Sequence, residues 1–321
     1  MQPLPTLAEI ESIAGFIDGA VPPTPQYSWP LLNARAGCEV WVKHENLTAI
    51  GSFKVRGALN YFARQREREP GLRGVVAATR GNFGQAVAFA ARRHGLEATV
   101  VVPHGNSPAK NAAMRALGAE LVEEGDDFQA ALEHAEKLAT ERQLHYVPSF
   151  HRDLAWGNAV STLRFLKTAP PLVRVYVPIG LGSGICGMLA ARDALGLATA
   201  VIGVAAEGAP GITQSFAEKR LCAHPVSTRI ADGMACSTPN AAALDYILAG
   251  VERIVVVSDD EIEAAIRAYS VDTRNIAEGA AGAGLAAVLK EKSANAGRRV
   301  GVVFTGGNVD PPVLERVLGA G

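Results

Sequence analysis

The chain has 321 residues, of which 48% are hydrophobic and 20% are charged, as expected of a globular protein long enough for two domains. Its formal net charge of −1 gives no electrostatic reason to expect binding to nucleic acid or to an anionic membrane. No apolar run approaches the length of a membrane span.

Short apolar runs alternate along the chain with longer segments of helical periodicity. Strands are predicted at residues 75–78, 99–102, 121–122, 173–177, 201–205, 254–257 and 300–304. Helices are predicted at 83–94, 108–117, 128–142, 158–166, 185–195, 259–268, 281–292 and 312–317. This alternation predicts an α/β fold with mostly parallel sheets covered by helices on both faces. Gly95, Gly118 and Gly196 each follow a helical run and are predicted to cap it.

The cysteines give no sign of a disulfide framework or a metal site. Cys38, Cys186, Cys222 and Cys236 are scattered and form no CxxC pair, which predicts reduced thiols in a cytoplasmic protein. Small buried side chains are their expected role. The chain does not open with a basic region followed by an apolar one, so no signal peptide is expected.

Residues 51–57 read Gly-Ser-Phe-Lys-Val-Arg-Gly and precede an apolar-periodic run. This places Lys54 at the start of a helix, where the partial positive charge of the helix terminus disfavours a second positive charge. Lys54 is therefore expected to favour the neutral amine, which can attack an aldehyde to form a Schiff base. A lone lysine would otherwise be an ordinary surface residue, so the interpretation depends on three glycine-rich segments further along the chain.

The first glycine-rich segment, residues 79–85, lies between a predicted strand and a predicted helix. Unsatisfied backbone N–H groups at such a junction form an anion site, and a substrate carboxylate could bind there. The second, residues 180–184, reads Gly-Leu-Gly-Ser-Gly after a strand and could cradle a phosphate, although it lacks the GxGxxG spacing of a dinucleotide site. The third begins at Thr305, at the carboxyl end of a strand, where side chains point into a ligand crevice.

Together these segments resemble the fold-type II pyridoxal-phosphate enzymes, in particular their threonine/serine dehydratase and serine racemase branch. The similar segments run from Thr24 to Asp310 and include 43–47, 231–234 and 278–281. The resemblance implies the tryptophan synthase β-like architecture of two open parallel-sheet α/β domains. The small domain would comprise 74–150 and the large domain 1–73 and 151–321, with the cofactor in the cleft between them.

The resemblance also implies a role for each site residue. Lys54 would hold pyridoxal 5′-phosphate as a Schiff base and remove the substrate's Cα proton. The cofactor would contact Phe53, Asn82, Gly233, Glu278 and Thr305, and its phosphate would be held by Gly180, Leu181, Gly182, Ser183 and Gly184. The amino-acid substrate would contact Ser52, Thr79, Arg80, Gly81, Asn82 and Phe83. A neutral threonine facing the ring nitrogen favours a reaction that quickly expels a β-leaving group.

The chain departs from the family pattern at several positions. Arg80 stands where serine is usual, and because a guanidinium stays protonated it cannot act as the second base that racemisation needs. Arg80 could bind a carboxylate, close the site or make a surface ion pair, and Phe83, where histidine is usual, could stack near the substrate or staple the helix start. Glu207 matches a family cation ligand, but Thr213 replaces its aspartate partner, so a Mg²⁺ or Ca²⁺ site and an ordinary solvated carboxylate are equal alternatives.

The expected reaction is α,β-elimination of water from a 3-hydroxy amino acid, most simply L-threonine or L-serine, to give a 2-oxo acid and ammonia. The same chemistry on 3-phenylserine or 3-hydroxyaspartate, β-replacement, and a non-catalytic α/β binding protein are the alternatives. The chain ends soon after Thr305, so regulation by a further domain is not expected. The resemblance also implies a homodimer.

Overall fold

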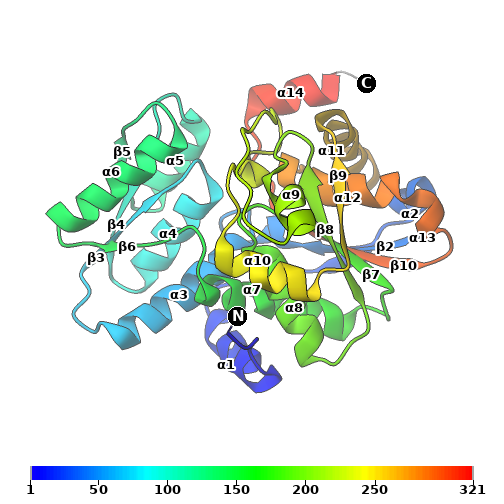
Figure 1. Cartoon of the computed structure of the whole chain (residues 1–321), viewed down its shortest axis with the longest axis horizontal. Helices are drawn as coiled ribbons and strands as arrows, with labels where there is room; N and C mark the ends of the chain where they lie inside the picture. The colour runs from blue at the N-terminus through cyan, green and yellow to red at the C-terminus, as the bar shows by residue number, and fades with distance from the viewer. Residues whose placement is uncertain (1, 320–321) are drawn as a thin grey trace.

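The computed structural model describes residues 2–319 and contains two β-sheets. The larger sheet has six strands in the order β1-β2-β10-β7-β8-β9. The smaller sheet has four strands in the order β5-β4-β3-β6. Figure 1 shows the smaller sheet with α4, α5 and α6 on one side of the molecule and the larger sheet on the other.

The strands pair in parallel except at one edge, where β1 runs antiparallel to β2. β3 and β8 are buried along nearly their whole length, as expected of strands covered by helices on both faces. The bounds of the strands are Gln26–Ser28 (β1), Glu39–His44 (β2), Gly74–Ala78 (β3), Glu97–Val102 (β4), Glu120–Glu123 (β5), His145–Tyr146 (β6), Arg174–Pro178 (β7), Ala200–Ala206 (β8), Arg253–Val257 (β9) and Arg299–Phe304 (β10).

The helices cover both sheets. Their bounds are Leu7–Ile17 (α1), Pro30–Ala36 (α2), Lys54–Arg68 (α3), Asn82–Arg93 (α4), Pro108–Ala116 (α5), Phe128–Glu141 (α6), Arg152–Thr168 (α7), Ser183–Ala194 (α8), Gly211–Glu218 (α9), Ala241–Gly250 (α10), Asp259–Thr273 (α11), Gly279–Lys290 (α12), Lys292–Asn295 (α13) and Pro311–Gly319 (α14), with 3₁₀ turns at Glu45–Leu47 (η1) and Asp232–Met234 (η2). Within residues 2–319, no helix is long and apolar enough to cross a membrane.

The predicted α/β fold with parallel sheets is confirmed, and each predicted strand and helix corresponds to an observed element. Gly95, Gly118 and Gly196 all have positive φ just after a helix, as predicted. The prediction omitted β1, β2, β6, α1, α2, α9, α10 and α13, and it began α7 six residues too late. α1 carries a capping box between Thr6 and Glu9 that identifies its start.

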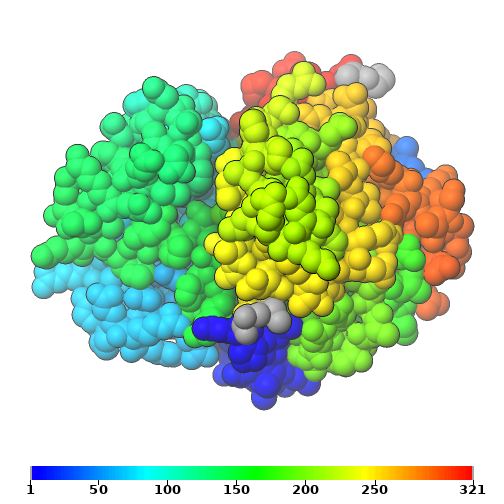
Figure 2. All heavy atoms as spheres, in the orientation of Figure 1, coloured from blue at the N-terminus to red at the C-terminus, as the bar shows by residue number. Residues whose placement is uncertain are grey.

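One hydrophobic core is shared by elements of both sheets. It includes buried residues of α3, α4, α7 and α8 together with strand residues such as Val75 and Val177. α3 and α7 approach closely at Gly157, where an added Cβ would lie 2.4 Å from the Arg56 carbonyl oxygen. Figure 2 shows the surface of the part around residues 74–150 set off from the rest by a furrow. The division into domains at 73/74 and 150/151 stays a prediction.

Candidate active site

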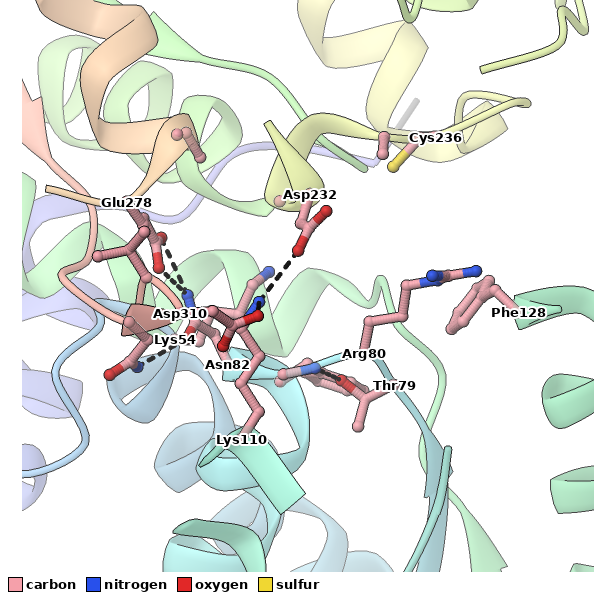
Figure 3. Close-up of a pocket in the computed structure, with 18 of the residues that line it drawn as sticks. Lys54, Thr79, Arg80, Asn82, Lys110, Phe128, Asp232, Cys236, Glu278 and Asp310 are labelled. Carbon is pink, nitrogen blue, oxygen red and sulfur yellow. Dashed lines mark hydrogen bonds and ion pairs between the residues drawn. The ribbon is translucent and has the colours of Figure 1, made fainter. Parts of the chain in front are cut away.

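A pocket lies between the two sheets, where loops from the carboxyl ends of parallel strands converge. It brings together nine of the residues predicted for the site: Lys54, Thr79, Arg80, Gly81, Asn82, Phe83, Leu181, Gly233 and Glu278. Figure 3 shows several of their side chains projecting into one space. The other predicted residues, apart from Glu207, lie beside the pocket without lining it: Ser52, Phe53, Gly180, Gly182, Ser183, Gly184 and Thr305.

Lys54 is the first residue of α3, as the sequence predicts. Its amine lies 5.2 Å from the centre of the Phe53 ring and 6.0 Å from that of Phe83. Burial lowers the pKa of Lys54, and this effect outweighs the opposing influence of Cys236 and Glu278. Burial thus acts in the same direction as the helix terminus invoked from the sequence, and both favour the neutral amine.

A buried ionic network fixes the start of α3. The Arg56 guanidinium donates to the Glu45 carboxylate at 2.8 Å, and both side chains are 1% exposed. Arg56 also donates to the carbonyl oxygens of Val21 and Pro22. Because Arg56 is two residues from Lys54, this network holds the helix turn that presents the lysine.

The Lys54 loop is joined to the third glycine-rich segment by main-chain contacts. The Phe53 N–H donates to the Thr305 carbonyl at 3.0 Å, and Ser52 forms an antiparallel bridge with Gly306. Within residues 2–319, the buried hydroxyls of Ser52 and Thr305 have no hydrogen-bond partner. Buried hydroxyls without partners are uncommon and indicate groups available to a ligand.

The N-terminus of α4 forms the second wall of the pocket. Its N-cap, Gly81, provides no side-chain cap, while the Thr79 hydroxyl accepts from the N–H groups of Gly81 and Gly84. The N–H groups of Asn82 and Phe83 have no acceptor among the described residues. Free N–H groups at a helix N-terminus attract an anion, so this turn is suited to a carboxylate.

Asn82 connects the two sides of the pocket. Its Nδ2 donates to both Glu278 carboxylate oxygens, at 2.8 and 2.9 Å, and its Oδ1 accepts from Asn308 at 2.7 Å. Burial raises the pKa of Glu278 above its ordinary value, against the opposing influence of Asn82 and nearby lysines. A ligand oxygen bonded to Asn82 would therefore compete with Glu278 for the same amide hydrogens.

The Gly-Leu-Gly-Ser-Gly segment leads into α8, which begins at Ser183 without a side-chain cap. Gly182 has φ of +104°, a conformation that favours glycine. A Cβ on Gly180 would lie 2.3 Å from the Gly233 carbonyl oxygen, so the two segments meet only because the glycine has no side chain. The uncapped turn can accept a phosphate through its backbone N–H groups.

These residues fit pyridoxal phosphate. Lys54 supplies an amine whose pKa is lowered, and Thr305 supplies an unpartnered buried hydroxyl. The α8 turn supplies backbone donors suited to a phosphate. The three groups are of the kinds needed for the cofactor's aldehyde, ring and phosphate.

The structure adds pocket residues that sequence reasoning missed. Lys110 of α5 forms ion pairs with Asp232 at 3.0 Å and with Asp310 at 3.9 Å, across the pocket mouth. Phe128 and Cys236 also line the pocket. Cys236 is therefore not the buried structural thiol that was expected, unlike the other three cysteines. Asp232 and Asp310 lie in motifs visible in the sequence, whereas Lys110, Phe128 and Cys236 give no local signal.

Glu207 lies apart from this pocket. It is exposed just after β8. Among residues 2–319, no group of three or more histidine, cysteine, aspartate or glutamate side chains is arranged to hold a metal ion. The structure thus gives no support to a cation site at Glu207.

Comparison with known proteins places this geometry in context. The family described as pyridoxal-phosphate dependent enzyme matches residues 17–306. An L-threonine ammonia-lyase of Thermotoga maritima is 32% identical over 317 residues, which are 98% of this chain and 79% of the relative. A pyridoxal 5′-phosphate-dependent aspartate racemase has a similar structure, with a TM-score of 0.91, 30% identity, and coverage of 98% and 99% of the two chains. Threonine deaminase isoform 2 from Solanum lycopersicum, in its processed form, gives a TM-score of 0.89 at 27% identity, covering 99% and 95%.

Proposed function

Because this chain belongs to the family of pyridoxal-phosphate-dependent enzymes and is an ammonia-lyase that uses this cofactor, we propose that it removes water from 3-hydroxy amino acids of the threonine and serine type. The observation that carries the proposal is that one pocket joins the Lys54 amine to the free N–H groups at the start of α4. The relatives' names divide between ammonia-lyases and racemases, so they leave the substrate's side chain open.

In the proposed reaction the Cα–H and Cβ–O bonds of the substrate break and water leaves. Addition of water to the resulting enamine then gives a 2-oxo acid and ammonia. Pyridoxal phosphate supplies the electron sink for the pair left by the Cα–H bond. Lys54 would hold the cofactor, and its neutral amine would accept the Cα proton of the substrate.

The remaining residues orient the substrate. The N–H groups of Asn82 and Phe83 would bind its carboxylate, and the Thr305 hydroxyl would meet the ring nitrogen of the cofactor. The turn at Ser183 would bind the phosphate. A guanidinium such as that of Arg80 has no acceptor nitrogen and cannot serve as a second base, so elimination is expected and racemisation is not.

The first test is 2-oxo acid release by the purified, cofactor-loaded protein. The panel contains L-serine, L-threonine, threo- and erythro-3-phenylserine and threo-3-hydroxyaspartate. Release from at least one substrate supports the proposal, whereas no release from any contradicts it. Formation of a β-substituted product only when a thiol is added would point to β-replacement instead.

The role of Lys54 is tested with Lys54→Ala, which should remove both 2-oxo acid release and the visible absorbance of the lysine-bound cofactor. Lys167→Ala is the matched control, because Lys167 is an exposed lysine paired with Glu11 on the outer surface. Persistence of the absorbance in Lys54→Ala would show that another group holds the cofactor. Size-exclusion chromatography with light scattering tests the expected homodimer.

A further inference from the structure

Arg80 is a cation in the pocket that the proposed reaction leaves without a role. It follows β3 in the turn that leads into α4, so its backbone adjoins the proposed carboxylate site. Figure 3 shows its side chain extending away from Glu278 and Lys54, on the side where Phe128 lies. Arg80 is exposed and lines the pocket.

The carboxylates at the pocket are committed to other groups. Asp232 and Asp310 pair with Lys110, and Asp310 also accepts from Ser107 at 2.5 Å. Glu278 accepts from the Asn82 amide. Among residues 2–319, no carboxylate forms an ion pair with Arg80, whereas the other arginine of the pocket, Arg229, lies 3.8 Å from Asp259.

A substrate with one carboxylate would leave this charge unmatched. Its carboxylate would be bound at the start of α4, and Arg80, in the same turn, would line the pocket with no second anionic group of the substrate to bind. A guanidinium offers a planar pair of N–H donors whose spacing matches the two oxygens of a carboxylate.

We propose that Arg80 binds a second carboxylate carried on the substrate's Cβ, which makes a 3-hydroxy dicarboxylic amino acid such as 3-hydroxyaspartate the preferred substrate. This inference rests on the proposed dehydratase function and names its substrate class. Elimination of water from 3-hydroxyaspartate, followed by hydrolysis, gives oxaloacetate and ammonia. The second carboxylate is retained throughout and takes no part in bond breaking.

Threonine and 3-hydroxyaspartate provide a matched pair, because a methyl group on Cβ of one replaces the carboxylate of the other. We compare kcat/KM for L-threonine and threo-3-hydroxyaspartate in the unaltered enzyme, in Arg80→Gln and in Arg80→Lys. The unaltered enzyme should prefer 3-hydroxyaspartate. Arg80→Gln should reduce that preference about 10- to 100-fold, as expected for loss of a charge-assisted pair, with threonine turnover changed by less than about threefold.

Arg80→Lys should restore part of the preference, because it keeps the charge but loses the paired donors. The control is Arg142→Gln, which removes an exposed arginine outside the pocket. Arg142 pairs with Glu120 at 2.8 Å, so the ratio of the two kcat/KM values should not change. A preference for threonine or phenylserine in the unaltered enzyme, or an equal loss for both substrates in Arg80→Gln, would overturn the assignment.

A binding measurement separates this inference from the reaction itself. Succinate and butyrate share a four-carbon chain and differ by one carboxylate. Calorimetry on the cofactor-loaded protein should show tighter binding of succinate, and Arg80→Gln should abolish the difference. Equal binding of both acids to the unaltered protein would contradict the role of Arg80. Failure to release a 2-oxo acid from any substrate would instead overturn the dehydratase function, and this substrate class with it.

Discussion

Replacement of Arg56 by methionine should strongly destabilise the protein. The Glu45 carboxylate that it neutralises is fully buried and would retain only neutral hydroxyl donors, from Thr24 and Ser161, with Lys43 nearby. Removing one member of a buried ion pair costs about 3–5 kcal/mol. Because the two hydroxyl donors and Lys43 still stabilise the Glu45 carboxylate, the loss of the ion pair should cost ~3 kcal/mol, the lower end of this range.

The same substitution leaves two carbonyl groups without their donor. Arg56 donates at 3.1 Å to the oxygens of both Val21 and Pro22. Each lost hydrogen bond costs about 1 kcal/mol, so the whole change should be about 5 kcal/mol. The Glu45→Gln, Arg56→Met double variant should lose at least ~2 kcal/mol less than the sum of the two single changes. Each single change leaves the partner's charge buried and unpaired, whereas the double variant removes both charges.

The assay is urea denaturation of the cofactor-free protein, followed by circular dichroism. Arg64→Met is the control on the same helix, because its ion pair with Glu67 is exposed (41% and 63%) and should contribute less than ~1 kcal/mol. A loss in Arg56→Met no greater than that of Arg64→Met, or additive effects in the double variant, would refute the account of the buried network.

The pH dependence provides a further check. Burial alone would raise the pKa of Glu45, but Arg56, Lys43 and Ser161 together hold it below its ordinary value of 4.5. A lowered folded pKa contributes stability that is present above pH ~4.5 and is lost as the pH falls through the folded value. Arg56→Met should remove this contribution, so its loss of stability should be larger at pH 7 than at pH 3.

Three further predictions follow from the packing and electrostatics of the site. Gly157→Ala should destabilise the protein by about 1–3 kcal/mol in urea denaturation, because its Cβ would lie 2.4 Å from the Arg56 carbonyl oxygen. The control is Gly15→Ala in α1, whose Cβ would meet nothing within 4 Å and which should stabilise the protein by up to ~1 kcal/mol. Glu278→Gln should stabilise the cofactor-free protein more at pH 8 than at pH 4. Burial raises the pKa of Glu278 in the folded state, so the ionised carboxylate destabilises the fold once the pH exceeds the pKa of the unfolded state. Equal gains in stability at the two pH values would contradict this. Attachment of pyridoxal phosphate to the apoprotein, followed by absorbance, should reach its half-maximal rate below pH 10.5, because burial lowers the pKa of Lys54; a midpoint at or above 10.5 would contradict this.

The local sequence was sufficient to predict the loops of the site but not their contacts. The loops at 79–85 and 180–184 follow buried strands and open helices, a pattern visible in residue order alone. Lys54 could be placed at a helix start because an apolar-periodic run follows it. In the omitted strand β2 burial alternates only over residues 39–42, because the last three residues, including Lys43 and His44, are all buried. Polar residues in a buried strand can be recognised only when their partners are known.

Long-range pairings explain the remaining differences. Lys110 meets Asp232 over 122 positions and Asn82 meets Glu278 over 196, so neither contact leaves a trace in local spacing. Likewise the lowered pKa of Lys54 has burial of the side chain as a cause, which local spacing does not show. Sequence order thus identifies the groups that can react, and the packing between the sheets determines their protonation.

The same distinction separates the reaction from its specificity. Lys54, the α4 turn and the α8 turn are each built into a strand–loop–helix connection, so the chemistry they support is set by the parallel-sheet fold. Arg80 lies in the α4 turn, where the backbone N–H groups form the proposed carboxylate site. That backbone site does not depend on which side chain stands at position 80. Among residues 2–319 no carboxylate forms an ion pair with Arg80, and the pocket aspartates Asp232 and Asp310 pair with Lys110. Specificity can therefore change at position 80 while the reacting groups stay in place, which is why Arg80→Gln should alter the choice between two substrates without abolishing turnover of either.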